Sequence, residues 1–115
     1  MTKRNHKMFV EDILGSIKKI ESYIKGLSYE QFVKQGMIVD AVIRNMEIIG
    51  EAAKNIPDAV REKNSEIPWN KMIGLRNIAT HAYFGVDLEI IWKIITENLP
   101  KTKNQIRKML RSNLF

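Results

Sequence analysis

The sequence predicts an all-α protein that folds as a bundle of four or five main helices. Apolar residues recur at spacings of three and four along almost the whole chain, the pattern of a helix with one buried face. No segment shows the alternating β-branched residues and tight turns that indicate strands. With 115 residues the chain is expected to form a single domain over residues 1–115, with flexible ends at residues 1–8 and 112–115.

The first half of the chain predicts three helices. The first covers residues 9–25 and is expected to stop at Gly26. Ser28, followed three residues later by Gln31, forms a capping-box pattern that begins the next helix. Residues 37–55 are apolar on a wide face, so this segment is expected to be the central helix.

The second half predicts shorter helices that proline and polar caps delimit. Residues 56–64 form a short helix with a proline in its first turn. Residues 65–68 are a connection, because the residue before a proline resists the helical conformation. Residues 69 to about 81 form the next helix, which is expected to end near a glycine. Asp87 then caps another helix, and Pro100 opens the last one.

The net charge of +6 comes from the two ends of the chain. Three of the 19 lysines and arginines lie in residues 1–8 and five in residues 101–115, whereas all 13 acidic residues lie between. On the last predicted helix Lys103, Arg107 and Arg111 are four residues apart and share a face away from the apolar stripe. This face suits contact with RNA phosphates; the alternative is a solvated helix surface.

Composition narrows the classes of protein and of site. The chain has no cysteine, which excludes disulfides, thiolate nucleophiles and cysteine metal ligands and fits a reducing cytoplasm. No apolar run is long enough to span a bilayer, and the basic N-terminus lacks the features of a secretory signal. We therefore expect a cytoplasmic protein without membrane contact. No HExxH motif, paired histidines or tight carboxylate cluster occurs, so no metal and no cofactor are predicted.

One apolar stretch, GLRNIATHAYF at residues 74–84, carries Arg76, Asn77, His81 and Tyr83. On a helix Arg76 and His81 diverge by roughly 140°, whereas Asn77 and His81, four residues apart, share a face. Arg76 and His81 can still flank one groove, one on each edge, if the arginine reaches inward and the helix ends just after His81. The stretch therefore predicts polar groups gathered at the C-terminal end of a helix, on the edge of a cleft.

These residue types suit the cleavage of an RNA phosphodiester. Neutral histidine can accept or donate a proton near neutral pH, and arginine can hold two phosphate oxygens at once. Cleavage needs activation of the 2′-hydroxyl or protonation of the leaving 5′-oxygen, and it needs stabilisation of the charge that develops at phosphorus. One histidine and one arginine supply both. By itself the spacing is weak evidence, because such a pair usually means a surface arginine and a hydrogen-bonded histidine, with Asn77 on the helix surface and Tyr83 in the core.

The central helix adds a carboxylate and a possible interface. Glu51 lies within the wide apolar face, and our hypothesis is that it orients Arg76 or His81 across the helix pair; the alternative is a glutamate in water at the bundle edge. The apolar surface around this helix predicts burial on more than one side. The second side is either a subunit interface, where Gly50 allows close approach, or the interior of the chain's own bundle.

Two blocks of sequence are distinctive: AVIRNMEIIGEAAKNIP at residues 41–57 and IPWNKMIGLRNIATHAYFGVD at residues 67–87. Both resemble the HEPN superfamily, and specifically its HepT-like ribonuclease toxins. The second block contains the family motif: arginine, four residues, histidine, one residue, tyrosine. The likeness extends over about residues 15–99, and the order and spacing of the two blocks agree with the family.

The resemblance implies a fold, an activity and partners. It implies an up-and-down helical bundle that forms a homodimer, with Arg76 and His81 of both subunits lining one cleft. Arg76 and His81 match the catalytic pair of a metal-independent endoribonuclease toxin, and Asn77 matches a polar position beside them. In this type VII-like toxin–antitoxin system, a minimal nucleotidyltransferase antitoxin neutralises the toxin by AMP transfer to the motif tyrosine, here Tyr83. The alternatives are a non-catalytic helical module that binds nucleotide or RNA, and a protein whose dimer surface alone matters.

Overall fold

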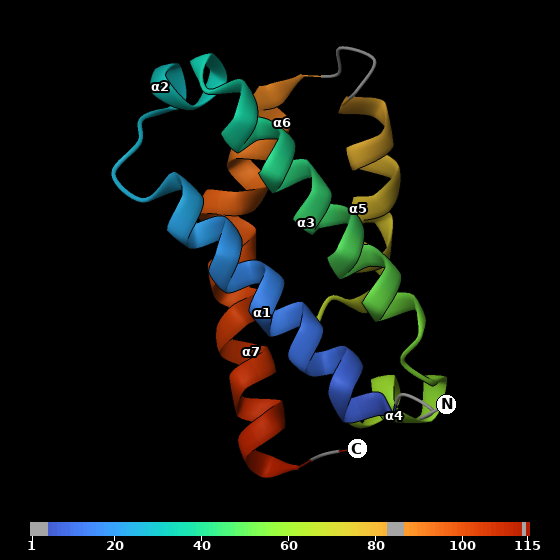
Figure 1. Ribbon diagram of the computed structural model, residues 1–115. Helices are drawn as coiled ribbons and strands as arrows, with labels where there is room; N and C mark the ends of the chain where they lie inside the picture. The colour runs from blue at the N-terminus through green and yellow to red at the C-terminus, as the bar shows by residue number, and fades with distance from the viewer. Residues whose placement is uncertain (1–4, 83–86, 114) are drawn as a thin grey trace.

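The computed structural model describes residues 5–82, 87–113 and 115 of the chain. Four long helices run alternately up and down in a bundle (Figure 1). They are α1 (His6–Ile24), α3 (Gly36–Lys54), α5 (Trp69–Ala82) and α7 (Leu99–Ser112). The described residues contain no strand, and the predicted all-α bundle is confirmed.

Three short helices and one π-helical turn connect the long helices. They are α2 (Tyr29–Lys34), α4 (Asp58–Lys63), α6 (Leu88–Lys93) and the π-helix η1 (Ile94–Asn98). The predicted capping box is present: the Ser28 hydroxyl accepts from the Gln31 N–H at 3.2 Å, and the Gln31 side chain accepts from the Ser28 N–H at 2.9 Å. Asp87 caps α6 as expected, since its carboxylate accepts from the N–H of Glu89 at 2.9 Å.

Two proline positions differ from the prediction. Pro57 is the N-cap of α4, directly before the helix, rather than a residue of its first turn. Pro100 does not open a separate helix, because α6, η1 and α7 form one continuous helical run. In the π turn the N–H of Leu99 bonds to the carbonyl of Ile94, five residues earlier. This wider turn lies immediately before Pro100, which has no N–H to donate, and so accommodates the proline without ending the helix.

The core lies around α3, which packs against α1 on one side and α5 on the other. The apolar stripes predicted from sequence point into this core; its largest fully buried side chains include Ile13, Ile17, Ile20, Phe32, Met46, Ile49, Met72, Ile91, Ile95, Ile106 and Met109. The wide apolar face of α3 is therefore largely covered within the chain. Among the described residues, no helix is both long and apolar enough to cross a membrane.

Two glycines have roles that other residues would not fill. Gly26 follows α1 with φ of +79°, a left-handed conformation that favours glycine, and the predicted stop of the first helix is confirmed. Gly50 lies where α3 and α5 approach: a Cβ there would be 2.9 Å from the backbone nitrogen of Arg76 and 3.2 Å from the carbonyl oxygen of Ile73. The close approach at Gly50 places the middle of α5 directly beside α3.

Candidate active site

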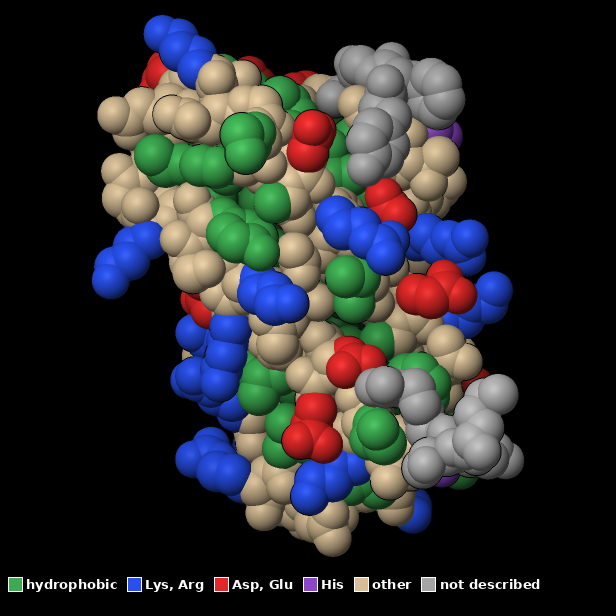
Figure 2. Space-filling model, in the orientation of Figure 1, with side chains coloured by type: hydrophobic (Ala, Val, Ile, Leu, Met, Phe, Trp, Pro, Cys, Tyr) green, Lys and Arg blue, Asp and Glu red, His purple; other side chains and the backbone are tan. Residues whose placement is uncertain are grey.

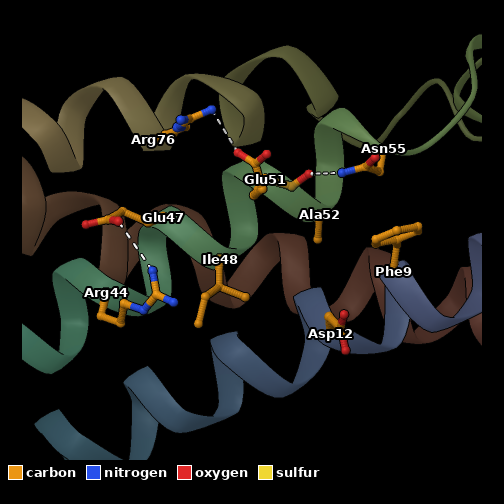
Figure 3. Close-up of a pocket in the computed structure, with 9 residues that line it drawn as sticks. All are labelled: Phe9, Asp12, Arg44, Glu47, Ile48, Glu51, Ala52, Asn55 and Arg76. Atoms are coloured by element: carbon orange, nitrogen blue, oxygen red, sulfur yellow. Dashed lines mark hydrogen bonds and ion pairs between the residues drawn. The ribbon is translucent and has the colours of Figure 1, made fainter. Parts of the chain in front are cut away.

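An ion pair between α5 and α3 lies at the centre of the candidate site. The Arg76 guanidinium nitrogen Nη1 is 2.9 Å from Oε2 of Glu51 (Figure 3). Both side chains are more than half exposed, at 58% and 54%, so the guanidinium remains open to a ligand in water. Glu51 therefore contacts Arg76 across the helix pair, which is one of the two arrangements that the sequence left open.

One side of Arg76 faces a groove of mixed charge. This groove of about 370 Å³ lies between α1, α3 and α5, and Figure 3 shows the side chains that line it. Its charged residues are the two arginines Arg44 and Arg76 and the three acids Asp12, Glu47 and Glu51. Arg44 lies 3.5 Å from Glu47 on the same helix. Carboxylates outnumber guanidinium groups here, so an anionic ligand gains little from this side.

The other side of Arg76 faces a smaller, cationic groove between α3 and α5. It has a volume of about 260 Å³ and is lined by Gly50, Lys54, Ile73, Arg76, Asn77 and Thr80. It contains two cations and no carboxylate. Asn77 lies next to Arg76 in this groove, and the Thr80 hydroxyl donates to the carbonyl of Arg76 at 2.9 Å. We call this lining the Lys54 groove.

His81 lines neither of the two grooves that the described residues form around Arg76. His81 is exposed in the last turn of α5, four residues after Asn77, and belongs to neither groove that contains Arg76. Because α5 continues through Ala82, the angular separation of roughly 140° between positions five apart applies. Tyr83 lies outside the described residues.

The two polar residues of α3 next to the site differ. Arg44 faces the mixed-charge groove, whereas Asn45 is 5% exposed and its amide donates to the carbonyl of Ala41 at 2.9 Å. Asn45 therefore belongs to the interior of the bundle and does not line either groove beside Arg76.

The cations of α7 lie away from Arg76. The Lys103 ammonium contacts both carboxylate oxygens of Glu21, at 2.9 and 3.0 Å, and is only 19% exposed. It ties α7 to α1, so its charge is largely matched within the fold. Arg107 and Arg111 are exposed and line a groove with Leu14 of α1. In Figure 2 basic side chains predominate along the edge formed by α7, whereas acidic and basic ones alternate over α1, α3 and α5.

Sequence reasoning missed two residues of the site. Lys54 and Thr80 were not singled out, although each follows a recognised residue by one turn: Lys54 is four after Gly50, and Thr80 is four after Arg76. Lys54 and Thr80 line one groove with Arg76 because α3 packs against α5 at Gly50, and the sequence does not indicate this packing. In the described parts of the chain, no group of three or more His, Asp or Glu side chains is placed to hold a metal ion.

Comparisons with known proteins identify relatives along nearly the whole chain. The family model described as ribonuclease HepT-like matches residues 13–109. A Methanocaldococcus jannaschii protein with a provisional RNase name is 45% identical over 92% of this chain and 97% of its own length. "Probable ribonuclease HepT" of Thermococcus cleftensis is 42% identical over 93% and 97%. A Caldanaerobacter subterraneus protein, also provisionally named an RNase, is 40% identical over 90% and 92%. No solved structure matches.

Proposed function

Because the chain belongs to the HepT-like ribonuclease family, we propose that it is an endoribonuclease toxin that cleaves RNA phosphodiesters without a metal ion. The observation that carries the proposal is the exposure of Arg76 and His81 on α5, the helix that holds the family motif. The relatives that match over almost their full lengths carry RNase names, and these names support the same reaction class.

The proposed reaction uses one acid–base group and one fixed positive charge. His81 takes the proton from the ribose 2′-hydroxyl, or gives one to the leaving 5′-oxygen, as the 2′-oxygen bonds to phosphorus and the bond to the 5′-oxygen breaks. Arg76 holds the non-bridging phosphate oxygens and stabilises the negative charge that develops on them. Asn77, beside Arg76 in the Lys54 groove, supplies a hydrogen-bond donor to the same phosphate.

The proposed active unit is a homodimer. Within one chain the side chains of Arg76 and His81 diverge, so a cleft on a two-fold axis would bring Arg76 of one subunit close to His81 of the other. The same axis would bring two guanidinium groups together and raise the local positive potential for a phosphate backbone.

Single substitutions at the two proposed catalytic residues test the reaction. His81→Ala and Arg76→Ala should each lower RNA cleavage by about 10²- to 10⁴-fold and relieve growth arrest on expression. His81→Ala should still bind RNA, because the phosphate contacts remain. RNA cleavage by purified protein, followed on gels in the presence of EDTA, measures both points. Unchanged growth arrest in both variants, or a clear loss of cleavage on chelation, would contradict the proposal.

Neutralisation by a partner enzyme belongs to the same proposal. We infer that a minimal nucleotidyltransferase antitoxin transfers AMP from ATP to the hydroxyl of Tyr83 with release of pyrophosphate, so that added phosphates occupy the cationic site and exclude RNA. Tyr83→Phe should then remain toxic when the antitoxin is co-expressed, whereas the unsubstituted chain should carry added AMP by mass spectrometry. An unmodified Tyr83 under these conditions would leave only inhibition by protein–protein contact.

A further inference from the structure

Next to Arg76 lies a cation that the proposed reaction has not used. We propose that Lys54 binds an RNA phosphate adjoining the one that Arg76 holds, so that the Lys54 groove is the path by which the RNA backbone reaches the site. This inference rests on the proposed function and adds a substrate-binding residue to it. Lys54 would act as a positioning group for the RNA chain, without a part in proton transfer.

The charges on the two sides of Arg76 decide from which side a phosphate approaches. On the mixed-charge side, three carboxylates face two arginines, and Glu51 already contacts the guanidinium. On the other side, Lys54 and Arg76 share a groove that contains no carboxylate. Since a polyanion is attracted to the side of net positive charge, RNA is expected to lie in the Lys54 groove.

The ammonium of Lys54 is available for such a contact. Lys54 is exposed and takes part in none of the ion pairs among the described residues. Neighbouring cations are engaged: Arg44 pairs with Glu47, and Arg61 contacts Asp58 and donates to two carbonyls at the end of α3. Lys54 is thus the described cation beside Arg76 that can bind a phosphate without first losing a carboxylate.

The order of residues along the groove fits a nucleic-acid strand. Gly50 brings α3 against the backbone of Arg76, and Lys54 follows Gly50 by four residues, about 6 Å along the helix axis. This rise is on the scale of one phosphate-to-phosphate step. Because α3 and α5 run in opposite directions, Lys54 lies towards Ile73 and Thr80 lies at the other end, next to His81. A strand in the groove would pass Lys54 and then Arg76 as it runs towards Thr80.

The salt dependence of RNA binding tests the proposal without any need for cleavage. The probe is a short 2′-O-methyl oligoribonucleotide, whose blocked 2′-oxygen prevents the reaction, and binding is followed by fluorescence anisotropy over a series of KCl concentrations. Affinity falls as the salt concentration rises, and Lys54→Gln should make the plot of log affinity against log salt shallower by about 0.7, the value of one phosphate contact on a single strand. At 0.1 M salt this corresponds to about fivefold weaker binding. Lys54→Arg should retain the slope.

Lys18→Gln is the matched control, since Lys18 is also exposed on a long helix but lines no groove beside Arg76. It should leave the slope unchanged, and Lys54→Ala provides a second neutral variant if Lys54→Gln fails to fold by circular dichroism. Equal slopes for the variants at Lys54 and Lys18 would overturn the inference, and so would a loss of kcat with unchanged binding. RNA cleavage by the unsubstituted protein tests the proposed function independently. If the Lys54 effect is seen but no cleavage occurs, the RNA-binding groove is supported and the ribonuclease function is contradicted.

Discussion

At the scale of single residues, the Arg76 guanidinium lies between a carboxylate on one side and an ammonium on the other. Glu51 contacts it at 2.9 Å, and Lys54 shares its second groove. A phosphate that enters from the Lys54 side would therefore meet a guanidinium whose opposite side already contacts Glu51. Because the ion pair is more than half exposed, its effect on folding stability is expected to be small. We propose that the ion pair restricts where Arg76 points.

Substitution of Glu51 by glutamine tests this restriction. Glu51→Gln should lower kcat for RNA cleavage by about tenfold, because a freer Arg76 is less often placed for the transition state. Binding of RNA should stay unchanged or tighten, since a negative charge is lost, and the melting temperature should barely move. Single-turnover kinetics with anisotropy binding separates the two effects.

Glu47→Gln is the control for this change. Glu47 lies on the same helix and pairs with Arg44 at 3.5 Å, so the variant removes the same charge and the same type of contact. It should leave kcat unaltered. Equal effects of the Glu51 and Glu47 variants would reduce Glu51 to one charge among several in the groove.

At the scale of helices, the site depends on how closely α3 and α5 approach. Gly50 is the residue that permits this approach, because a side chain there would meet the backbone of Arg76 and the carbonyl of Ile73. A glycine in the interior of a helix otherwise costs about 1 kcal/mol relative to alanine. The chain tolerates this cost at a position where α5, which carries Arg76, must lie against α3.

Gly50→Ala is therefore expected to destabilise the fold although alanine is the better helix former. Forcing a Cβ to within 2.9 Å of the Arg76 nitrogen should lower the free energy of unfolding by about 1–3 kcal/mol. The shifted helix should also weaken RNA cleavage. Urea denaturation measures the first effect, with an unchanged m value as evidence that the comparison is valid.

Gly15 provides the control within α1. A Cβ at Gly15 meets nothing within 4 Å, so Gly15→Ala should raise stability by about 0.5–1 kcal/mol. If both alanine variants stabilise the protein, the close contact at Gly50 is not the constraint that the packing indicates.

At the scale of the whole molecule, a single chain separates the two groups that the proposed reaction needs. Arg76 opens onto two grooves, and His81 lies on neither of them. A homodimer in which each subunit supplies one group to a shared cleft would resolve this separation. The basic face formed by Arg107 and Arg111 on α7 would then contact RNA away from the cleft, whereas Lys103 is held by Glu21.

Mixing two inactive variants tests the shared cleft. Arg76→Ala and His81→Ala proteins, unfolded and refolded together, should regain about a quarter of normal RNA cleavage, because half of the random dimers would hold one intact composite site. Each variant refolded alone should stay inactive. If the mixture remains as inactive as its components, Arg76 and His81 do not act across a two-fold axis.

Much of the fold was readable from local sequence, because its signals are local in origin. Apolar spacing gave α1, α3, α5 and α7, the Ser28–Gln31 capping box began α2, and Asp87 capped α6. These features depend on residues within one turn of each other, so no knowledge of packing is needed. The prediction was wrong at two prolines: Pro57 is the N-cap of α4 rather than part of its first turn, and the π turn before Pro100 lets the helix continue through that residue.

The candidate site divides in the same way. The motif residues Arg76, Asn77 and His81 are neighbours along one helix and were found from their spacing. The partners of Arg76 were not fixed by spacing: the contact with Glu51 remained one of two possibilities, and Lys54 was not foreseen. Both come from α3, more than twenty residues away in the chain, and which of its faces meets α5 depends on the close packing at Gly50. Contacts between distant segments follow from how helix surfaces fit together, and only the tertiary structure specifies that fit.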